Sequence, residues 1–336
     1  MQRLAYLDIL KAFAIALVVI GHIISNCIDG GAETIINMMI YTIHIPLFLV
    51  ISGYLVKDKP INLIFFRNLF IRFVIPYTTW VILLTLFYVG LGGIIKGSLS
   101  GILVSIGNNW LHSFLWFIKA YLITFVLFQL LQRLSAIGRF IIGTVILAVA
   151  NLLLCILGEP IGYKALSQIL SLSIYTYTLF AFGYCMKMYL CNYALWKIIL
   201  GLTIYIILIP FYKIEYNYFT SSFAVLYNSG EWFVFLYRFL LGVSISTSLI
   251  FIFSKFLISS RKGIVLVQEI GSNTLQIYMF QSLIIEAILS RFVRFNSSFW
   301  GALEIIVFTI LFLVITVFVI RITKNWKIAS LFLWGK

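Results

Sequence analysis

The sequence is poor in charge, and this shortage excludes water-soluble folds. Aspartate, glutamate, lysine and arginine make up 10% of the 336 residues, against about 25% in a typical soluble domain. Hydrophobic residues make up 63%, and a soluble fold of this length buries only about three quarters of its chain surface. Most of the molecular surface therefore needs lipid as its solvent.

Cysteine and histidine are also scarce, which argues against disulfide and metal frameworks. The four cysteines form no CxxC pair and read as small hydrophobic side chains, and only three histidines are present. The net charge of +14 comes without a basic tail or a basic-aromatic groove, so it does not indicate nucleic-acid binding. We expect neither a bound metal nor a nucleic-acid partner.

Long hydrophobic runs dominate what remains. A transmembrane helix needs about 20 mostly apolar residues. Ten such segments lie near 7–27, 37–56, 71–91, 113–131, 140–157, 168–186, 194–211, 231–253, 269–290 and 300–320. The first contains charged residues and no small-residue cleavage motif, so we expect a retained helix and not a signal peptide. The prediction is an all-α, polytopic integral membrane helical bundle of about ten transmembrane helices, forming one domain over residues 1–336.

The basic residues give the orientation of this bundle. With the N-terminus in the cytoplasm, ten spans place most loop lysines and arginines on the cytoplasmic side, notably in 57–72 and 321–336. We therefore predict that both termini are cytoplasmic. No internal repeat, linker or low-complexity segment is visible.

The first helix carries an unusual polar stripe. Lys11 and His22 are eleven residues apart, which is three turns plus about 20° of an α-helix and about 16 Å along its axis. Both therefore face the same way, and Asp8 is placed to pair with Lys11. Ionisable groups inside a membrane are functional candidates by default. The alternative, in which His22 bonds a neighbouring helix and Lys11 reaches to the interface, is equally supported by this spacing.

Further polar positions follow along the chain. His44 is expected at the outer end of the second helix, as a cap-like contact or a site residue, while Ser52 and Gly53 are small and favour helix packing. Arg67 and Arg72 flank the cytoplasmic end of the third helix, as topology charges or as a phosphate clamp.

The fourth and later helices carry other candidates. Lys119 is expected to be buried, with Trp116 on the adjoining face of the same helix. For three further residues a buried pair between a carboxylate and a basic side chain is preferred over chemistry: Glu231, Arg238 and Glu286. All three histidines, including His112, fall in the outer half of the predicted bundle, and the arginine pair falls on the inner side.

Five blocks of this sequence resemble acyltransferase family 3, the bacterial membrane O-acyltransferases, and in particular the branch that acetylates surface polysaccharides. LDILKAFAIALVVIGH matches the basic-x10-His signature with Lys11 and His22. HIPLFLVISGYL, FFRNLFIRFVIPY, FLWFIKAYL and IGSNTLQIYMFQ match later blocks. Two positions depart from the family pattern. Gln281 stands where relatives usually have histidine, and the spacing of Arg67 and Arg72 is looser than usual.

The resemblance implies a function and its partners. The donor is acyl-CoA, most often acetyl-CoA, as a co-substrate with no permanently bound cofactor. The acceptor is a hydroxyl of a cell-surface glycan or lipid-linked sugar. The protein would lie in the bacterial inner membrane as a multi-pass protein. We expect no appended hydrolase-like domain, so it would act alone or with glycan-assembly proteins.

The same resemblance assigns roles to residues of this sequence. His22 would act as general base or transient acyl carrier, since imidazole titrates close to neutral pH. Asp8 would orient or neutralise Lys11. Lys11, Arg67 and Arg72 would hold the phosphates of CoA. The acceptor site or cavity would be lined by His44, Ser52, Trp116, Lys119, Tyr278 and Gln281.

Two other function classes fit the same composition. A transporter or flippase for glycans also needs many spans and buried charges, but the missing repeat symmetry and the lack of paired broken helices oppose it. A non-catalytic scaffold for glycan assembly is the third alternative. It predicts that His22→Gln and Lys11→Ala are harmless.

Overall fold

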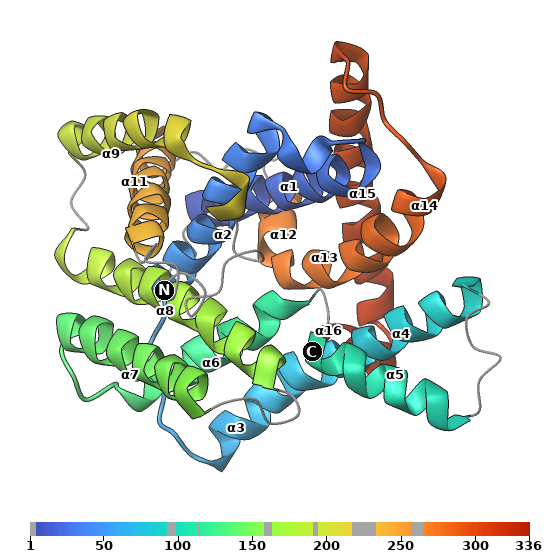
Figure 1. The fold of residues 1–336 in the computed structure, drawn as a ribbon, viewed down its shortest axis with the longest axis horizontal. Coiled ribbons are helices and arrows are strands. Elements are labelled where there is room, and N and C mark those ends of the chain that lie inside the picture. The colour runs from blue at the N-terminus through green and yellow to red at the C-terminus, as the bar shows by residue number, and fades with distance from the viewer. Residues whose placement is uncertain are drawn as a thin grey trace. The chain divides into compact units, whose positions relative to one another are not determined.

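The computed structural model describes residues 5–92, 99–112, 115–157, 163–190, 194–216, 233–256 and 265–336 (Figure 1). The regular structure within these ranges is helical, without strands, which confirms the all-α prediction. Seven helices are long and apolar enough to cross a membrane: Ala5–Cys27, Ile35–Leu55, Leu63–Tyr88, Ala136–Leu154, Gln168–Tyr189, Phe233–Lys255 and Phe299–Lys324. The protein is therefore a polytopic helical membrane protein.

The three other predicted spans are helical but interrupted or short. The fourth, predicted at 113–131, is α6 (Trp116–Leu130), a helix that forms a bent pair at 54° with the preceding α5 (Leu99–His112). The seventh is the shorter helix α9 (Leu195–Leu208). The ninth breaks at Asn273, which separates α12 (Val265–Ser272) from α13 (Thr274–Gln281). Residues 99–112 were not predicted to be a helix, because their apolar content is low.

The chain divides into two compact units, each assembled from non-contiguous segments. The first comprises Met1–Leu17, Glu33–Lys59 and Ala120–Ser272, and the second Val18–Ala32, Pro60–Lys119 and Asn273–Lys336. The prediction of a single domain stays a prediction. The helix α1 (Ala5–Cys27) contributes to both units.

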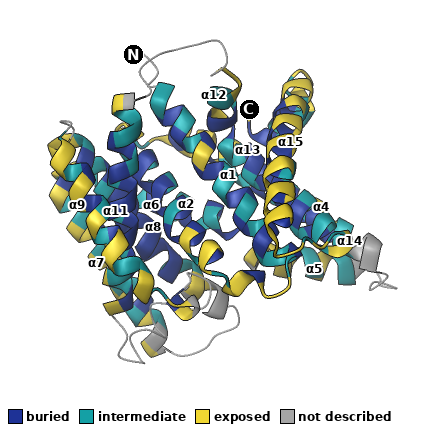
Figure 2. Ribbon diagram, turned by 90° about the horizontal axis from the view of Figure 1, so that it is seen from above, coloured by how far each residue is buried: buried dark blue, intermediate teal, exposed yellow. Residues whose placement is uncertain are grey.

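The first unit is built around α8. Its elements are α2 (Ile35–Leu55), α7 (Ala136–Leu157), α8 (Tyr163–Tyr189), α11 (Phe233–Phe256), η3 (Ile209–Phe211) and η4 (Ile214–Tyr216), with α9, α12 and most of α6. The span within α8 is 72% buried, whereas that of α7 is 22% buried (Figure 2). The core of this unit therefore lies along α8, and α7 forms part of its outer surface.

Small residues allow α2 and α8 to pack with their backbones in contact. A Cβ atom at Gly53 would lie 1.8 Å from the carbonyl oxygen of Phe180, and one at Gly183 would lie 2.1 Å from that of Val50. Only glycine fits at both positions, because any side chain would overlap the facing backbone. This confirms the packing role predicted for Gly53.

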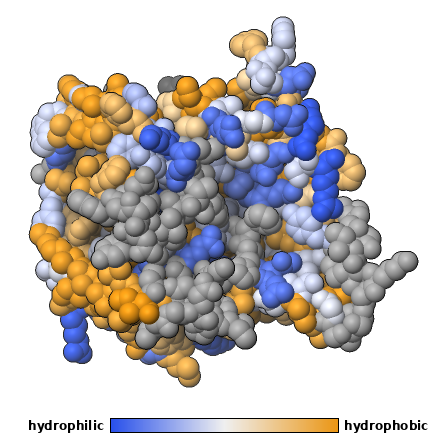
Figure 3. All heavy atoms as spheres, viewed as in Figure 1, coloured by the Kyte–Doolittle hydropathy of each residue, from blue (hydrophilic) through white to orange (hydrophobic). Residues whose placement is uncertain are grey.

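The outward faces of α7 and α9 are apolar. Exposed isoleucine, leucine and valine side chains follow α7, among them Ile141, Val145 and Val149, and α9 exposes Trp196 and Ile199. Figure 3 shows hydrophobic side chains gathered over both helices. Such a surface suits lipid and not water, because apolar patches of this extent are rare on soluble monomers.

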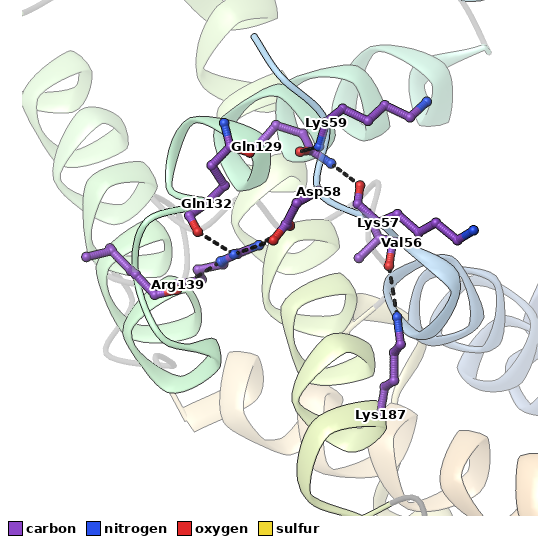
Figure 4. A network of polar contacts seen from close by, with 9 residues as sticks. Val56, Lys57, Asp58, Lys59, Gln129, Gln132, Arg139 and Lys187 are labelled. Atoms are coloured by element: carbon purple, nitrogen blue, oxygen red, sulfur yellow. Dashed lines mark hydrogen bonds and ion pairs between the residues drawn. The ribbon is translucent and has the colours of Figure 1, made fainter.

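Polar contacts fix the segment that follows α2 (Figure 4). Arg139 donates two hydrogen bonds to the carboxylate of Asp58, at 2.6 and 2.9 Å. The Gln129 amide donates to the Lys57 carbonyl and accepts from the Lys59 backbone N–H. Lys187 donates to a backbone carbonyl of the same segment at 3.1 Å. Basic residues expected to set topology therefore also hold this loop on α6, α7 and α8.

The second unit contains two π-helical segments. Its elements are α3 (Leu63–Leu69), η2 (Phe70–Val74), α4 (Ile75–Gly92), α5, α13, η6 (Ser282–Leu289), α14 (Ser290–Phe292), α15 (Phe299–Lys324) and α16 (Lys327–Trp334), with the second part of α1. The short turn η1 (Gly31–Glu33) follows α1. The π-helices are η2 and η6. Such segments are rare and are frequently found at functional sites.

Candidate functional site

The second unit brings His22 against a carboxylate. The Nδ1 atom of His22 lies 3.1 Å from Oε1 of Glu286, and the two side chains are 20% and 8% exposed. A carboxylate at Nδ1 fixes the ring orientation and favours the tautomer in which Nε2 accepts protons. The expectation that Glu286 pairs with an arginine or lysine is wrong, because its partner is this imidazole.

The π-helix η6 explains how Gln281 joins this pair. The Nε2 atom of Gln281 lies 3.2 Å from Oε1 of Glu286, and Gln281 is fully buried. In an α-helix, residues five apart point about 140° away from each other. The i→i+5 repeat of a π-helix brings them into line. The same carboxylate oxygen thus contacts both Gln281 and His22.

The end of α1 that carries His22 is anchored to the segment after α14. Arg294 donates a hydrogen bond to the Asn26 carbonyl at 2.6 Å, and the Phe295 backbone N–H donates to the Cys27 carbonyl at 2.9 Å. The Asn26 amide also donates to the His22 carbonyl at 2.7 Å. The bonds from Arg294 and Phe295 satisfy the last two carbonyls of the helix, which have no partner within it. They also hold the backbone of His22 in place.

Tyr88 and Arg291 extend the polar surroundings of Glu286. Tyr88 interacts electrostatically with the Glu286 carboxylate. The guanidinium of Arg291 lies 4.9 Å from the centre of the Tyr88 ring. Neither residue was identified from the sequence, since they belong to helices that are distant along the chain.

Asp8 and Lys11 lie in the first unit and form the predicted pair. Lys11 Nζ is 2.7 Å from Asp8 Oδ1, so each neutralises the charge of the other. Both residues belong to the continuous helix α1 that also carries His22, which confirms the helical spacing used in the prediction. Gly271 packs on the Asp8 backbone, where a Cβ atom would lie 1.7 Å from the Asp8 carbonyl oxygen.

His44 is in the middle of α2 and not at its outer end, so its predicted place was wrong. The helix begins at Ile35, because Thr34 caps it by accepting the Asn37 backbone N–H. His44 is buried at 4% exposure, and its Nδ1 atom lies 2.6 Å from the Ile40 carbonyl one turn earlier. Ser52 is half-buried on the same helix. Both belong to the first unit.

Trp116, Lys119 and Tyr278 belong to the second unit. Trp116 is buried, and its ring lies 5.9 Å from that of Phe117, which lies 5.9 Å from that of Tyr278. Lys119 donates to the Leu111 carbonyl near the C-terminus of α5. The side chain of His112, at the end of α5, lies outside the described residues, as does Glu231.

Arg67 and Arg72 are both exposed, on α3 and η2. Within the described part of the chain no partner contacts the Arg67 side chain. Arg72 stacks over Phe73 at 5.8 Å and lies near Lys336, with which it interacts electrostatically. Arg72 therefore has a neighbouring cation from the other end of the sequence, and the phosphate clamp of Arg67 and Arg72 stays a prediction.

Comparison with known proteins supplies the family. The profile of the family described as an acyltransferase domain matches residues 4–323. The chain belongs to acyltransferase family 3. Nodulation protein NolL of Mesorhizobium japonicum is 28% identical to this acyltransferase over 152 residues, which are 43% of the chain and 40% of that protein. The similarity thus spans less than half of the length of that relative, and no solved structure matches the chain.

The site of this family member combines a partly buried imidazole with a carboxylate and an amide. Such a set can move a proton or form a bond to an acyl carbon. In the part of the chain that the structure describes, no group of three histidine, cysteine, aspartate or glutamate side chains is placed to hold a metal. The sequence signal for His22 was its spacing from Lys11. For Glu286 the sequence showed only a carboxylate inside an apolar segment and did not indicate its partner.

Proposed function

We propose that this membrane acyltransferase moves an acyl group, most simply acetyl, from cytoplasmic acyl-CoA to a hydroxyl of a cell-surface glycan or lipid-linked sugar. The observation that carries the proposal is the contact between His22 and Glu286 within the second unit. The bacterial inner membrane, where donor and exported glycans meet, is the proposed location.

His22 supplies the proton transfer in the simpler of two routes. Its Nε2 atom takes the proton of the sugar hydroxyl while the oxygen attacks the thioester carbonyl. The C–S bond then breaks, and the leaving thiolate takes the proton back from the imidazolium. Glu286 stabilises the imidazolium that forms between these steps, as a carboxylate does in acyl-transfer triads. General base catalysis of this kind contributes about 10²–10⁴-fold.

The second route uses His22 as a transient acyl carrier. Nε2 attacks the thioester carbonyl, the C–S bond breaks, and an acyl-imidazolium that keeps its Nδ1 proton forms with release of CoA thiolate. The sugar hydroxyl then attacks the acyl carbon, and the hydroxyl proton passes to the released imidazole or to the CoA thiolate. Glu286 supports this route by holding the ring with Nε2 directed away from the carboxylate.

Reconstitution with labelled acetyl-CoA and an acceptor glycan tests the proposal. We expect transfer by the wild-type protein and a loss of about 10²-fold or more in the variants His22→Ala and His22→Gln. Glu304→Gln is the control, because Glu304 is exposed on α15. Glycan movement without label transfer, undisturbed by His22→Ala, would favour the transporter. If neither label transfer nor glycan movement differs between the wild type and both His22 variants, the scaffold is favoured.

A further inference from the structure

Two lysines of the second unit converge on one buried amide. The Nζ atoms of Lys324 and Lys336 lie 2.8 and 3.3 Å from Oδ1 of Asn273, which is 2% exposed. Arg72 and Lys324 both repel the Lys336 ammonium electrostatically, so the three cations are neighbours. The amide oxygen accepts hydrogen bonds but carries no charge. It positions the two ammonium groups without neutralising them.

The position of Arg72 in this cluster follows from Pro76. Proline has no backbone N–H, so Pro76 cannot bond to the Arg72 carbonyl four residues earlier. The chain forms the wider turn of η2 instead, in which Ile75 bonds to the Phe70 carbonyl. This local geometry leaves the carbonyl side of Arg72 open to another segment.

Gly335 occupies that opening. A Cβ atom there would lie 2.7 Å from the carbonyl oxygens of both Ile71 and Arg72, and the backbone of Gly335 has φ +64°. Glycine is required twice, for the close approach and for the left-handed conformation. Its position at the end of α16 carries Lys336 to the neighbourhood of Arg72.

Tryptophan contacts hold α16 in this position. Trp334 is 1% exposed, and its Nε1–H donates to Thr323 Oγ1 at 2.8 Å. Trp80 of α4 donates to the Leu333 carbonyl at 3.0 Å, and the two indole rings lie 5.8 Å apart. The cluster is therefore built by α4, α13, α15 and α16 together with η2.

Among the described residues, the three cations of this cluster have no ion pair with a carboxylate side chain. No carboxylate side chain among residues 5–92, 99–112, 115–157, 163–190, 194–216, 233–256 and 265–336 forms an ion pair with Arg72, Lys324 or Lys336. Partial desolvation of the ammonium group, followed by repulsion from Lys324 and Arg72, lowers the pKa of Lys336 to about 8, although the residue is exposed. Charges that only set topology need to face the cytoplasm, and they have no reason to meet at a buried amide. Cations held together against their repulsion favour an anionic ligand.

We propose that Arg72, Lys324 and Lys336 form a binding site for a phosphate group, which in the proposed reaction is a phosphate of the CoA donor. This assignment rests on the proposed function. Arginine offers a planar fork of donors to phosphate, and the lysines add two mobile charges. Residues 57–72 and 321–336 are both cytoplasmic in the predicted topology, on the side from which CoA arrives. The phosphate of an anionic lipid would satisfy the same chemistry.

Binding measurements in nanodiscs of neutral phosphatidylcholine test the site without any turnover. CoA binding to the purified protein is compared with that of Lys324→Gln, Lys336→Gln and the matched control Lys327→Gln, whose lysine is exposed on α16. We expect each cluster variant to weaken CoA about tenfold or more and the control to leave it unchanged. Gly335→Ala keeps every charge but displaces the cluster, so it should also weaken CoA.

The outcomes separate the sources of phosphate and the two proposals. Dephospho-CoA lacks the 3′-phosphate of CoA. If the lysine variants bind dephospho-CoA as well as the wild type does, the 3′-phosphate is the group that the cluster binds. If phosphatidylglycerol competes with CoA in the wild type but not in the variants, the lipid also occupies the site, which supports it. Monodisperse variants that bind CoA and phosphatidylglycerol like the wild type would overturn the site, even if acyl transfer is observed. Cluster-dependent CoA binding without acyl transfer would leave the site intact and refute the proposed function.

Discussion

His22 Nδ1 and Glu286 Oε1 lie 3.1 Å apart, although the two residues are separated by most of the sequence. The carboxylate is also within 3.2 Å of the Gln281 amide, so its geometry is set from two sides. A base held by a fixed carboxylate is prepared for proton transfer before the substrate arrives, because no reorientation is needed.

Removing the charge of Glu286 should impair turnover more than binding. We expect Glu286→Gln to lower kcat by about 10²-fold with little change in KM for the acyl donor, because imidazolium formation loses its counter-charge. Steady-state kinetics in nanodiscs measure both values. Glu304→Gln on α15 should behave like the wild type. A Glu286→Gln enzyme with normal kcat would show that the carboxylate has only a packing role.

The Gln281 amide should matter through the carboxylate that it contacts. We expect Gln281→Leu to reduce kcat roughly tenfold, since it removes a hydrogen bond to a charged group. Gln281→His should retain most of the activity, because an imidazole N–H can donate to the same carboxylate oxygen. Equal kinetics of Gln281→Leu and the wild type would contradict this role.

The contact of α2 with α8 should be sensitive to a single methyl group. Gly53→Ala and Gly183→Ala introduce a Cβ atom 1.8 and 2.1 Å from facing carbonyl oxygens. We expect each to lower Tm in detergent by roughly 5–10 °C, because the two backbones must separate. Gly107→Ala on α5 is the control, since its Cβ would meet no atom within 4 Å. Unchanged melting of both interface variants would refute this packing.

The loop after α2 should lose stability in acid through Asp58. Hydrogen bonding to Arg139 is the main cause that lowers the pKa of the Asp58 carboxyl below its usual range. A carboxyl whose pKa is lower in the folded than in the unfolded protein stabilises the fold at any pH above its unfolded pKa. This contribution disappears as the pH falls through its folded pKa.

A substitution at this residue makes the pH dependence measurable. We expect Asp58→Asn to lower Tm at pH 7 by roughly 1–3 °C, since the aspartate is partly exposed. The difference should shrink as pH falls below about 4, where the carboxyl of the unfolded chain takes up a proton, and it should vanish below the lowered pKa of folded Asp58. Asp29→Asn is the control, because that carboxylate is 96% exposed. A difference that is constant with pH would contradict the ionic role of Asp58.

Hydropathy was sufficient for the helical membrane fold, and helical spacing was sufficient for one half of the site. The stripe with Asp8, Lys11 and His22 depends only on the regular repeat of one α-helix, so it could be predicted. Glu286 could not be assigned to His22, because the direction of the Glu286 side chain depends on a π-helix. No residue pattern in 282–289 predicts such a helix. The position of Arg72 could not be predicted either, because the sequence shows Pro76 but does not show that a π-helical turn precedes it.

Tertiary contacts account for the other differences. His44 was assigned to the outer end of the second helix, whereas the Thr34 cap starts α2 at Ile35 and leaves His44 in its middle. Lys324 and Lys336 were interpreted as topology charges, since sequence statistics cannot show that they meet Asn273. Their convergence depends on α16, a helix of eight residues that is too short for a hydropathy scan to detect.

The tight seat of Gly335 against the carbonyls of Ile71 and Arg72 bears on how the protein is handled. A purification tag or fluorescent protein fused after Lys336 would start within a residue of this contact. It would pull on the ammonium group that reaches Asn273. An assay of ligand affinity should therefore use protein without a fusion at this position.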